Sequence, residues 1–131
     1  MSQWDKIEAK NKKKMLDISR RAMFTISRNI IKRSPVLTGR FRNNWFSQID
    51  SPSEDTTEEV DKSGSIANAR TQDTISKVKF GHVFYFVNNL PYALALEFGH
   101  STVKAPAGMV RVSIADYQNE VERQARKVQN D

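Results

Sequence analysis

Residues 83–100 are the most apolar and most strongly patterned segment of the chain, and they limit the folds that the rest can adopt. Residues 83–87 are β-branched or aromatic without interruption, so a strand here would carry apolar side chains on both faces. Both faces would then have to be covered, which predicts the central strand of a small sheet. Asn88 and Asn89 favour a turn after this strand. A short helix is expected next, from residues three or four apart: Tyr92, Ala95, Leu96 and the terminating Gly99.

The length and composition fit one soluble domain spanning residues 1–131. The chain has no cysteine, so it contains neither a disulfide nor a thiolate metal site. No apolar run approaches the roughly 20 residues of a membrane-spanning helix, and we therefore expect no membrane partner.

The net charge of +6 is unevenly distributed along the chain. Residues 1–42 contain 12 basic and 3 acidic side chains, residues 43–75 contain 2 basic and 7 acidic ones, and residues 76–131 contain 7 basic and 5 acidic ones. The basic end fits contact with phosphate, contact with the acidic part of a neighbouring copy, or a plain solvated helix face. These three interpretations stay open at the level of sequence.

A long N-terminal helix is predicted over residues 4–33. Its apolar residues recur every three or four positions: Met15, Ile18, Ala22, Ile26 and Ile30, widened by Leu16, Met23 and Ile31. Lys6–Lys14 has little to bury, so we expect this part to project or fray. Pro35 disfavours a helical Ser34 and predicts the end of the helix there.

The middle of the chain predicts two strands separated by an acidic loop. Alternate residues from Phe41 to Ile49 indicate the first strand. Residues 51–64 are polar and acidic, which predicts an exposed loop, and a short helix follows over about 65–74. A second strand is predicted from Ile75 as the partner of the first, with a bulge or a close backbone approach at Gly81.

A C-terminal amphipathic helix is predicted over residues 106–128. Its apolar residues recur at intervals of four or three: Val110, Ile114, Tyr117, Val121, Ala125 and Val128. This stripe would pack on the sheet or contact a partner helix. The whole pattern predicts an α+β domain in which a small, mostly antiparallel sheet is packed by the long N-terminal helix and the C-terminal helix.

No motif for an enzyme is present in the sequence. Glu97 and His100 are three residues apart, which fits an acid–base pair and, more simply, a capping or structural contact. The other histidine, His82, lies in a different predicted element. The acidic cluster in residues 51–64 lacks the glycine and the ligand spacing of a calcium loop. We therefore expect no catalytic residue, no cofactor and no metal.

Two blocks of sequence resemble a known family. The first, Ser34–Trp45, reads SPVLTGRFRNNW and resembles the (S/T)P-x-x-TG-x-(L/F)-R-x-x-W signature of the neck and tail-completion proteins of long-tailed bacteriophages. The second reads NNLPYA at residues 88–93, LEFGHS at 96–101 and APAGMVR at 105–111, and it is similar to that family's second block. Among these proteins the chain is similar to the minor tail protein Z group of lambda-like phages.

This resemblance implies a structural protein of the virion with no catalysis and no cofactor. It implies a ring, commonly a hexamer, that is assembled in the host cytoplasm and lies at the junction of head and tail. The partners would be other copies of the chain, the head-closure or connector proteins, and the tail tube or tail terminator. DNA would pass through the channel of the ring.

The candidate subunit-interface residues lie in the two blocks: Arg40, Arg42, Trp45, Asn88, Asn89, Tyr92 and Glu97. An internal role fits Tyr92 and Glu97 equally well, and Arg40 with Arg42 also fits a phosphate site. The alternative function is a basic nucleic-acid-binding protein. It would use the Lys12–Arg33 helix face for phosphate and Trp45 or Phe46 for stacking on bases.

Overall fold

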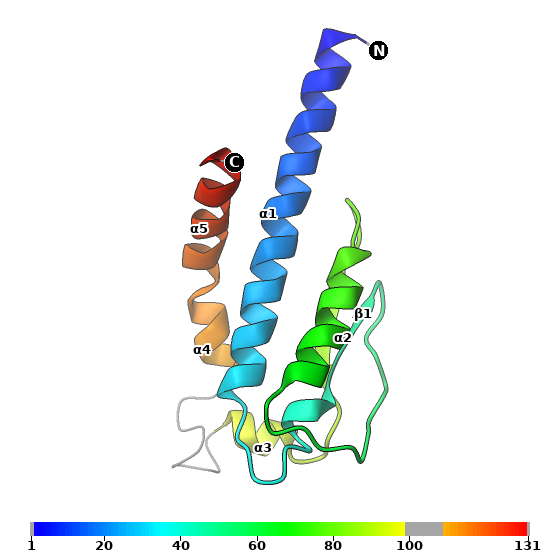
Figure 1. Ribbon diagram of the computed structural model, residues 1–131, viewed down its shortest axis with the longest axis vertical. Coiled ribbons are helices and arrows are strands. Elements are labelled where there is room, and N and C mark those ends of the chain that lie inside the picture. Colours follow the sequence, from blue (N-terminus) through cyan, green and yellow to red (C-terminus); the bar gives the residue numbers. More distant parts are fainter. Residues whose placement is uncertain (1, 99–108, 131) are drawn as a thin grey trace.

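The computed structural model describes residues 2–98 and 109–130. Its elements, in chain order, are α1 (Gln3–Arg33), the 3-10 turn η1 (Arg42–Asn44), β1 (Trp45–Ile49), α2 (Ser65–Ser76), β2 (Phe84–Asn88), α3 (Ala93–Glu97), α4 (Val110–Ala115) and α5 (Tyr117–Asn130). Figure 1 shows α1 in the middle, with α4 and α5 along one side and α2 with the sheet along the other. The predicted combination of a long N-terminal helix with a small antiparallel sheet is confirmed.

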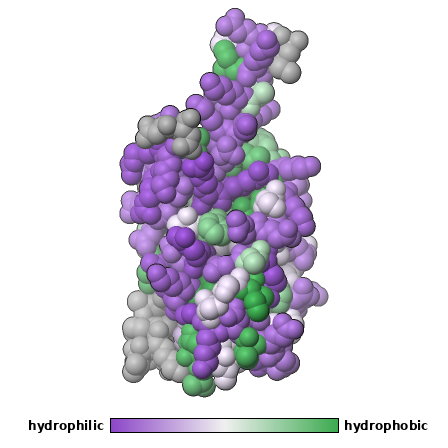
Figure 2. All heavy atoms as spheres, in the orientation of Figure 1, coloured by the Kyte–Doolittle hydropathy of each residue, from purple (hydrophilic) through white to green (hydrophobic). Residues whose placement is uncertain are grey.

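Helix α1 begins and ends where its flanking residues predict. The Ser2 hydroxyl accepts a hydrogen bond from the Asp5 backbone N–H, and the Asp5 carboxylate accepts one from the Ser2 N–H, which is a capping box. Ser34 caps the other end, immediately before Pro35. Residues 2–15 are exposed, so the first turns project beyond the rest of the fold, as predicted (Figure 1). Figure 2 shows this projecting end as largely hydrophilic, with a small hydrophobic area.

One hydrophobic core joins α1 to the sheet, α2 and the segments after β2. Its buried members are Ile30, Ile31, Phe41, Trp45, Ala67, Leu90 and Met109. The apolar stripe of α1 supplies Ile30 and packs Ile26 against this core, but Met15, predicted to belong to the stripe, is 54% exposed. The stripe is therefore longer than the domain that covers it.

The sheet, within the described residues, consists of β1 and β2 paired antiparallel, with Ser47 opposite Phe86. The predicted pairing of the apolar strand with the strand near Trp45 is thus confirmed. The expectation that the apolar strand lies centrally is wrong, because β2 has one neighbouring strand and all five of its residues are only half-buried. Its aromatic residues are accounted for by stacking, since the Phe86 ring packs on those of Trp45 and Phe84.

Strand β1 begins four residues later than predicted. The chain first turns through η1, where the Asn43 N–H donates to the Gly39 carbonyl and the Asn44 N–H donates to the Phe41 carbonyl. Alternation in the sequence does not distinguish this turn from a strand, because the side chains of both Asn43 and Asn44 are buried by contacts with another segment.

Strand β2 begins nine residues later than the predicted start at Ile75, which was wrong. Ile75 lies in α2, whose buried residues Ala67, Thr71 and Ile75 recur at steps of four along the helix. Tertiary packing against α1 thus overrides the strand propensity of β-branched residues. Gly81, predicted as a bulge or a close backbone approach, instead lies in the turn before β2, with a φ of 93°.

The acidic loop, residues 51–64, contains no helix or strand and is mostly exposed, as predicted. It nevertheless lies against the segment before β1. The Thr57 N–H donates to Asn44 Oδ1 at 2.9 Å, and Asn44 Nδ2 donates back to the Thr57 carbonyl at 3.0 Å. Gly39 has a φ of 91°, and a Cβ there would lie 2.5 Å from the Lys62 backbone nitrogen. Glycine is thus required for this close approach. The helix predicted after the loop is α2.

The C-terminal region differs from the prediction in its register. The helix predicted over 106–128 is two helices, α4 and α5, that meet at Asp116, and residues 106–108 lie outside the described residues. Arg33 of α1 donates to Ser113 Oγ at 2.7 Å and pairs with Asp116 at 3.4 Å, which ties this junction to α1.

The face that the two helices bury differs in part from the predicted apolar stripe, although Val128 belongs to both. Ile114 is 60% exposed, whereas the buried residues of the two helices are Ser113, Glu120, Gln124 and Val128. Helix α5 lies along α1, where Gln124 Nε2 contacts Thr25 Oγ1 at 3.5 Å. None of the helices in the described residues is long and apolar enough to cross a membrane.

Candidate subunit interface

The two sequence blocks that carry the family resemblance meet in space where α1 ends. Trp45 Nε1 donates to Ser34 Oγ at 2.8 Å, and this hydroxyl donates to the Ile30 carbonyl at 2.8 Å. The Met109 sulfur of the second block lies 3.5 Å from the same hydroxyl. We call residues 34–45, 88–97 and 109–111 the motif cluster. Trp45 is only 5% exposed, so its indole anchors this cluster from inside the fold.

The adjacent asparagines of the second block fasten the turn after β2 to the first block. Asn88 Nδ2 donates to the Phe41 carbonyl at 3.0 Å, while its Oδ1 accepts from the Leu90 N–H at 3.2 Å. Asn89 Nδ2 donates to the carbonyls of Ser53 and Asp55 in the acidic loop, at 2.9 and 3.1 Å. Both side chains therefore have internal hydrogen-bonding roles.

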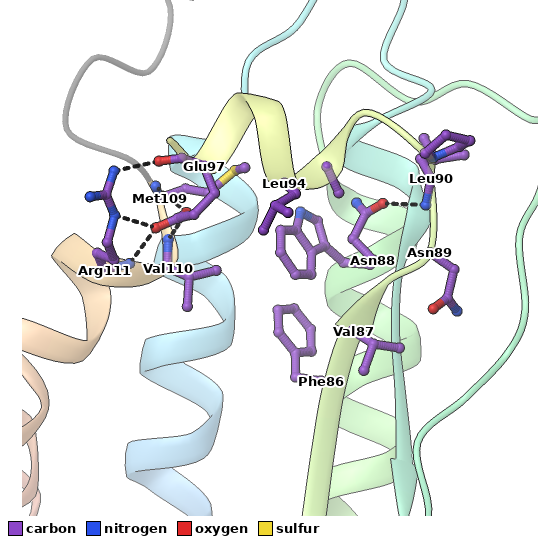
Figure 3. A pocket seen from close by; sticks show the side chains of 13 residues that line it. Phe86, Val87, Asn88, Asn89, Leu90, Leu94, Glu97, Met109, Val110 and Arg111 are labelled. Carbon is purple, nitrogen blue, oxygen red and sulfur yellow. Dashed lines mark hydrogen bonds and ion pairs between the residues drawn. The ribbon is translucent and has the colours of Figure 1, made fainter. Parts of the chain in front are cut away.

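Glu97 connects α3 to the first turn of α4 (Figure 3). Its Oε1 accepts from the backbone N–H groups of Met109 and Val110, at 2.9 and 2.8 Å. Its Oε2 accepts from the Arg111 N–H at 2.9 Å and from Arg111 Nε at 3.0 Å. The Arg111 guanidinium also donates to the Glu97 carbonyl and lies 4.7 Å from the Phe98 ring centroid.

These contacts determine the protonation of Glu97. Burial by itself raises the pKa of a carboxyl, but the three backbone N–H donors and the Arg111 side chain outweigh it and hold the pKa of Glu97 below its ordinary value. The carboxylate is thus charged and fully engaged, which confirms the structural interpretation of this residue. His100, the other member of the predicted pair, lies outside the described residues.

The two arginines of the first block, Arg40 and Arg42, donate hydrogen bonds to acceptors within the same chain. Arg42 donates to the carbonyls of Lys62, Lys32 and Ser34, at 2.7, 3.0 and 2.9 Å. Burial lowers the pKa of Arg42, and Asp61 partly offsets this effect. Arg40 pairs with Glu58 of the acidic loop at 2.9 Å. These contacts favour pairing within the chain over the phosphate site.

Arg70 was missed by sequence reasoning. Its Nη2 donates to the carbonyls of Asn43 and Trp45, at 2.6 and 3.0 Å, and its guanidinium lies 4.1 Å from the Phe46 ring centroid. Burial lowers the pKa of Arg70, and the nearby carboxylates of Glu59 and Asp55 partly compensate. No linear motif marks this arginine, because its role depends on how α2 lies against β1.

The seven candidate interface residues differ in exposure. Asn89 and Tyr92 are exposed, Trp45 is buried, and the other four are partly buried: Arg40, Arg42, Asn88 and Glu97. Tyr92 is 40% exposed, with its ring centroid 5.7 Å from that of Phe41. The use of these residues between subunits stays a prediction. It fits the exposed residues Asn89 and Tyr92 better than the buried Trp45.

Two hollows lie beside the motif cluster. The larger, about 550 Å³, is an apolar groove between β2, α3 and α4, with Phe86, Val110 and the 70% exposed Leu94 among its walls (Figure 3). The smaller, about 240 Å³, is lined by Pro35, Leu37, Thr38, Gly39, Phe41, Tyr92 and Leu96, and we call it the end pocket. The acidic loop passes beside it, because the Asp61 N–H donates to the Gly39 carbonyl at 3.2 Å.

Neither hollow has the groups of a reaction centre in the described part of the chain. The Glu97 carboxylate at the groove already accepts four N–H bonds, and no group of three or more His, Cys, Asp or Glu within residues 2–98 and 109–130 is placed to hold a metal. His82 accepts the Lys79 N–H on Nδ1 at 2.9 Å in the turn before β2. The apolar walls of the two hollows fit the docking of apolar side chains from another segment or another copy.

No protein-family model matches this chain, and neither the curated proteins nor the solved structures contain a significant match.

Proposed function

We propose that this chain is a structural subunit of the bacteriophage neck. It forms a hexameric ring that completes the tail and joins it to the head connector around the DNA path. The observation that supports this proposal is the motif cluster. Residues of the two blocks are distant in sequence yet in contact: Asn88 donates to the Phe41 carbonyl, 47 positions away, and the Ser34 hydroxyl lies 3.5 Å from the Met109 sulfur, 75 positions away.

The mechanism on this proposal is geometric. The cluster ties the end of α1 to the sheet, to α3 and to α4, so each copy presents its outer surfaces in a fixed arrangement. Head-to-tail contact between identical copies generates a ring when the rotation between neighbours closes. The ring contacts head-closure proteins on one side and the tail tube or tail terminator on the other, in the virion neck.

The test is the oligomeric state of the purified protein together with a phage that lacks it. Native mass spectrometry and electron microscopy are expected to show a closed ring of six copies. Virions made without the protein are expected to accumulate as intact heads and tails that fail to join. A protein that stays monomeric even with connector and tail-tube partners, or a phage that matures normally without it, would refute the proposal.

A second candidate function is nucleic-acid binding through α1. Five exposed lysines on its projecting turns favour it: Lys6, Lys10, Lys12, Lys13 and Lys14. Two features weigh against base stacking, since Trp45 is buried and one face of Phe46 lies against Arg70. Binding to duplex and single-stranded DNA, measured against salt, separates the two functions. A DNA-binding protein loses affinity steeply as salt rises, whereas a ring subunit assembles without nucleic acid.

A further inference from the structure

The apolar stripe of α1 continues past the end of the domain, where none of the described residues covers it. We call residues 2–15 the arm. Trp4, Ile7 and Met15 lie on the same helical face as Ile18 and Ala22. Successive members of this set are three, four or eight residues apart, which is close to one or two whole turns of the helix. Ala22 is buried, but Trp4 is 80%, Ile7 44% and Met15 54% exposed. The arm therefore presents an apolar face that residues 16–98 and 109–130 of its own copy leave exposed.

The arm is built to stay helical while it projects. Its N-terminus has the Ser2–Asp5 capping box, Glu8 and Lys12 form an ion pair at 3.1 Å one turn apart, and the Lys12 ammonium lies 5.8 Å from the Phe80 ring centroid. An exposed tryptophan on such a helix is the type of side chain that dominates interface energetics, since it offers a large rigid apolar area.

A complementary surface lies at the opposite end of the molecule. The end pocket, about 240 Å³, is apolar, and Leu37 at its edge is 76% exposed. Beside it the acidic loop exposes the carboxylates of Glu54, Asp55, Glu58 and Glu59. The arm carries five lysines and only two acids around its stripe. The arm thus offers the apolar Trp4 among lysines, and the end pocket offers an apolar hollow beside carboxylates, so the two surfaces are complementary in polarity and charge.

The two surfaces cannot meet within one copy. Helix α1 has 31 residues and is about 46 Å long. The arm forms its first turns, and residues 35–41, which help to line the end pocket, follow its last turn at the opposite end (Figure 1). Figure 2 shows hydrophobic groups reaching the surface at the lower end of the view, away from the arm. A contact between the two surfaces therefore joins different copies of the chain.

We propose that the arm of one copy docks at the end pocket of the next copy, with Trp4 as the apolar anchor and the arm lysines over the acidic loop. This contact is head-to-tail, so it propagates from copy to copy and closes into a ring or runs on as a filament. The inference rests on the proposed ring and supplies its contact surfaces.

The test uses one variant at each surface. Trp4→Ala removes the anchor, and Leu37→Arg places a positive charge at the edge of the pocket; both residues are exposed, so folding is preserved. Each variant alone is expected to be monomeric, with the dissociation constant between copies raised by about tenfold or more. A matched control, Ile114→Arg on the exposed face of α4, lies outside the arm, the end pocket and the motif cluster and is expected to assemble as the parent does.

Mixing the two variants identifies the geometry. The Leu37→Arg copy retains an intact arm and the Trp4→Ala copy retains an intact pocket, so an equimolar mixture forms a heterodimer and nothing larger, as measured by native mass spectrometry. An arm that pairs with a second arm gives no heterodimer in this mixture, and that result overturns the docking. Variants that still form rings overturn the docking and leave the ring proposal standing. A parent protein that is monomeric at every concentration, even with connector and tail-tube partners present, refutes both.

Discussion

Replacing Glu97 by Gln tests the contact that connects α3 to α4. The carboxylate accepts four N–H bonds, three of them from consecutive backbone groups of residues 109–111, and its side chain is 13% exposed. Gln is almost isosteric and keeps one carbonyl oxygen. Its NH₂ group, however, would replace Oε2, which accepts hydrogen bonds from the Arg111 N–H and from Arg111 Nε. All of these groups would then be donors, and two donors cannot bond to each other.

The expected loss of stability follows from these bonds. A hydrogen bond to a charged group contributes about 1.5–3 kcal/mol, and the two bonds to Arg111 share one acceptor atom, so they do not add in full. We expect Glu97→Gln to lower the free energy of unfolding by about 3 kcal/mol. At about 4 °C per kcal/mol for a chain of this length, the melting temperature falls by about 12 °C.

Urea unfolding at pH 7, followed by circular dichroism, measures this difference. Glu58→Gln is the matched control, since Glu58 also pairs with an arginine, at 2.9 Å, but its side chain is 88% exposed. Surface ion pairs contribute about 0–1 kcal/mol, so the control is expected to unfold almost as the parent does. A Glu97→Gln protein as stable as the Glu58→Gln protein would refute the assigned role of Glu97.

The pH dependence gives an independent check. The pKa of Glu97 in the folded protein is lowered from its ordinary value of 4.5. Its stabilising effect is therefore complete above the unfolded-state pKa and disappears as the pH falls through the folded-state pKa. The stability difference between parent and Glu97→Gln should be largest near neutral pH and should narrow on acidification below about pH 4. A difference that stays constant down to pH 3 would contradict this charge assignment.

Two further pairs of substitutions test the fold. Gly39→Ala should lower the free energy of unfolding by about 3 kcal/mol, because a Cβ there would lie 2.5 Å from the Lys62 backbone nitrogen. Gly81→Ala has a similar φ but open space around it, so it should cost only about 1 kcal/mol. Equal effects of the two substitutions in thermal melts would contradict the packing of the acidic loop. Val128→Ala should cost about 1–2 kcal/mol and Ile114→Ala under about 0.5 kcal/mol, since Val128 is buried and Ile114 exposed. A larger loss at Ile114 than at Val128 would contradict the burial of these two residues.

The parts of the fold that the sequence predicts are those set by local chemistry. Pro35 ends α1 because it restricts its neighbour, and Asn88 favours a turn after β2 because its side-chain oxygen accepts from the Leu90 N–H two residues on. The projecting start of α1 is predictable as well, since a segment with five lysines has little to bury. None of these features depends on which element packs next to it.

The incorrect predictions concern features that tertiary contacts decide. Ile75 looks like the start of a strand, but its position four residues after Thr71 places it on the buried face of α2. The predicted C-terminal stripe fails at Ile114, which is exposed, while the adjacent Ser113 is buried and accepts a hydrogen bond from Arg33 of α1. The role of Arg70 is invisible for the same reason, because its acceptors lie in another element.

Helix α1 connects the two surfaces that we propose to meet between copies. Its first turns form the arm, and its last turn leads directly into Pro35, which lines the end pocket. The motif cluster fixes the pocket relative to the end of α1, since Ser34 bonds to Ile30 and to Trp45, and Arg42 donates to the Lys32 carbonyl. Because α1 joins the arm to the segment that lines the pocket, the direction of the arm relative to the pocket is set within each copy. The rotation between neighbouring docked copies then depends on this direction. A change in the motif cluster should therefore alter the number of copies in a ring before it abolishes docking.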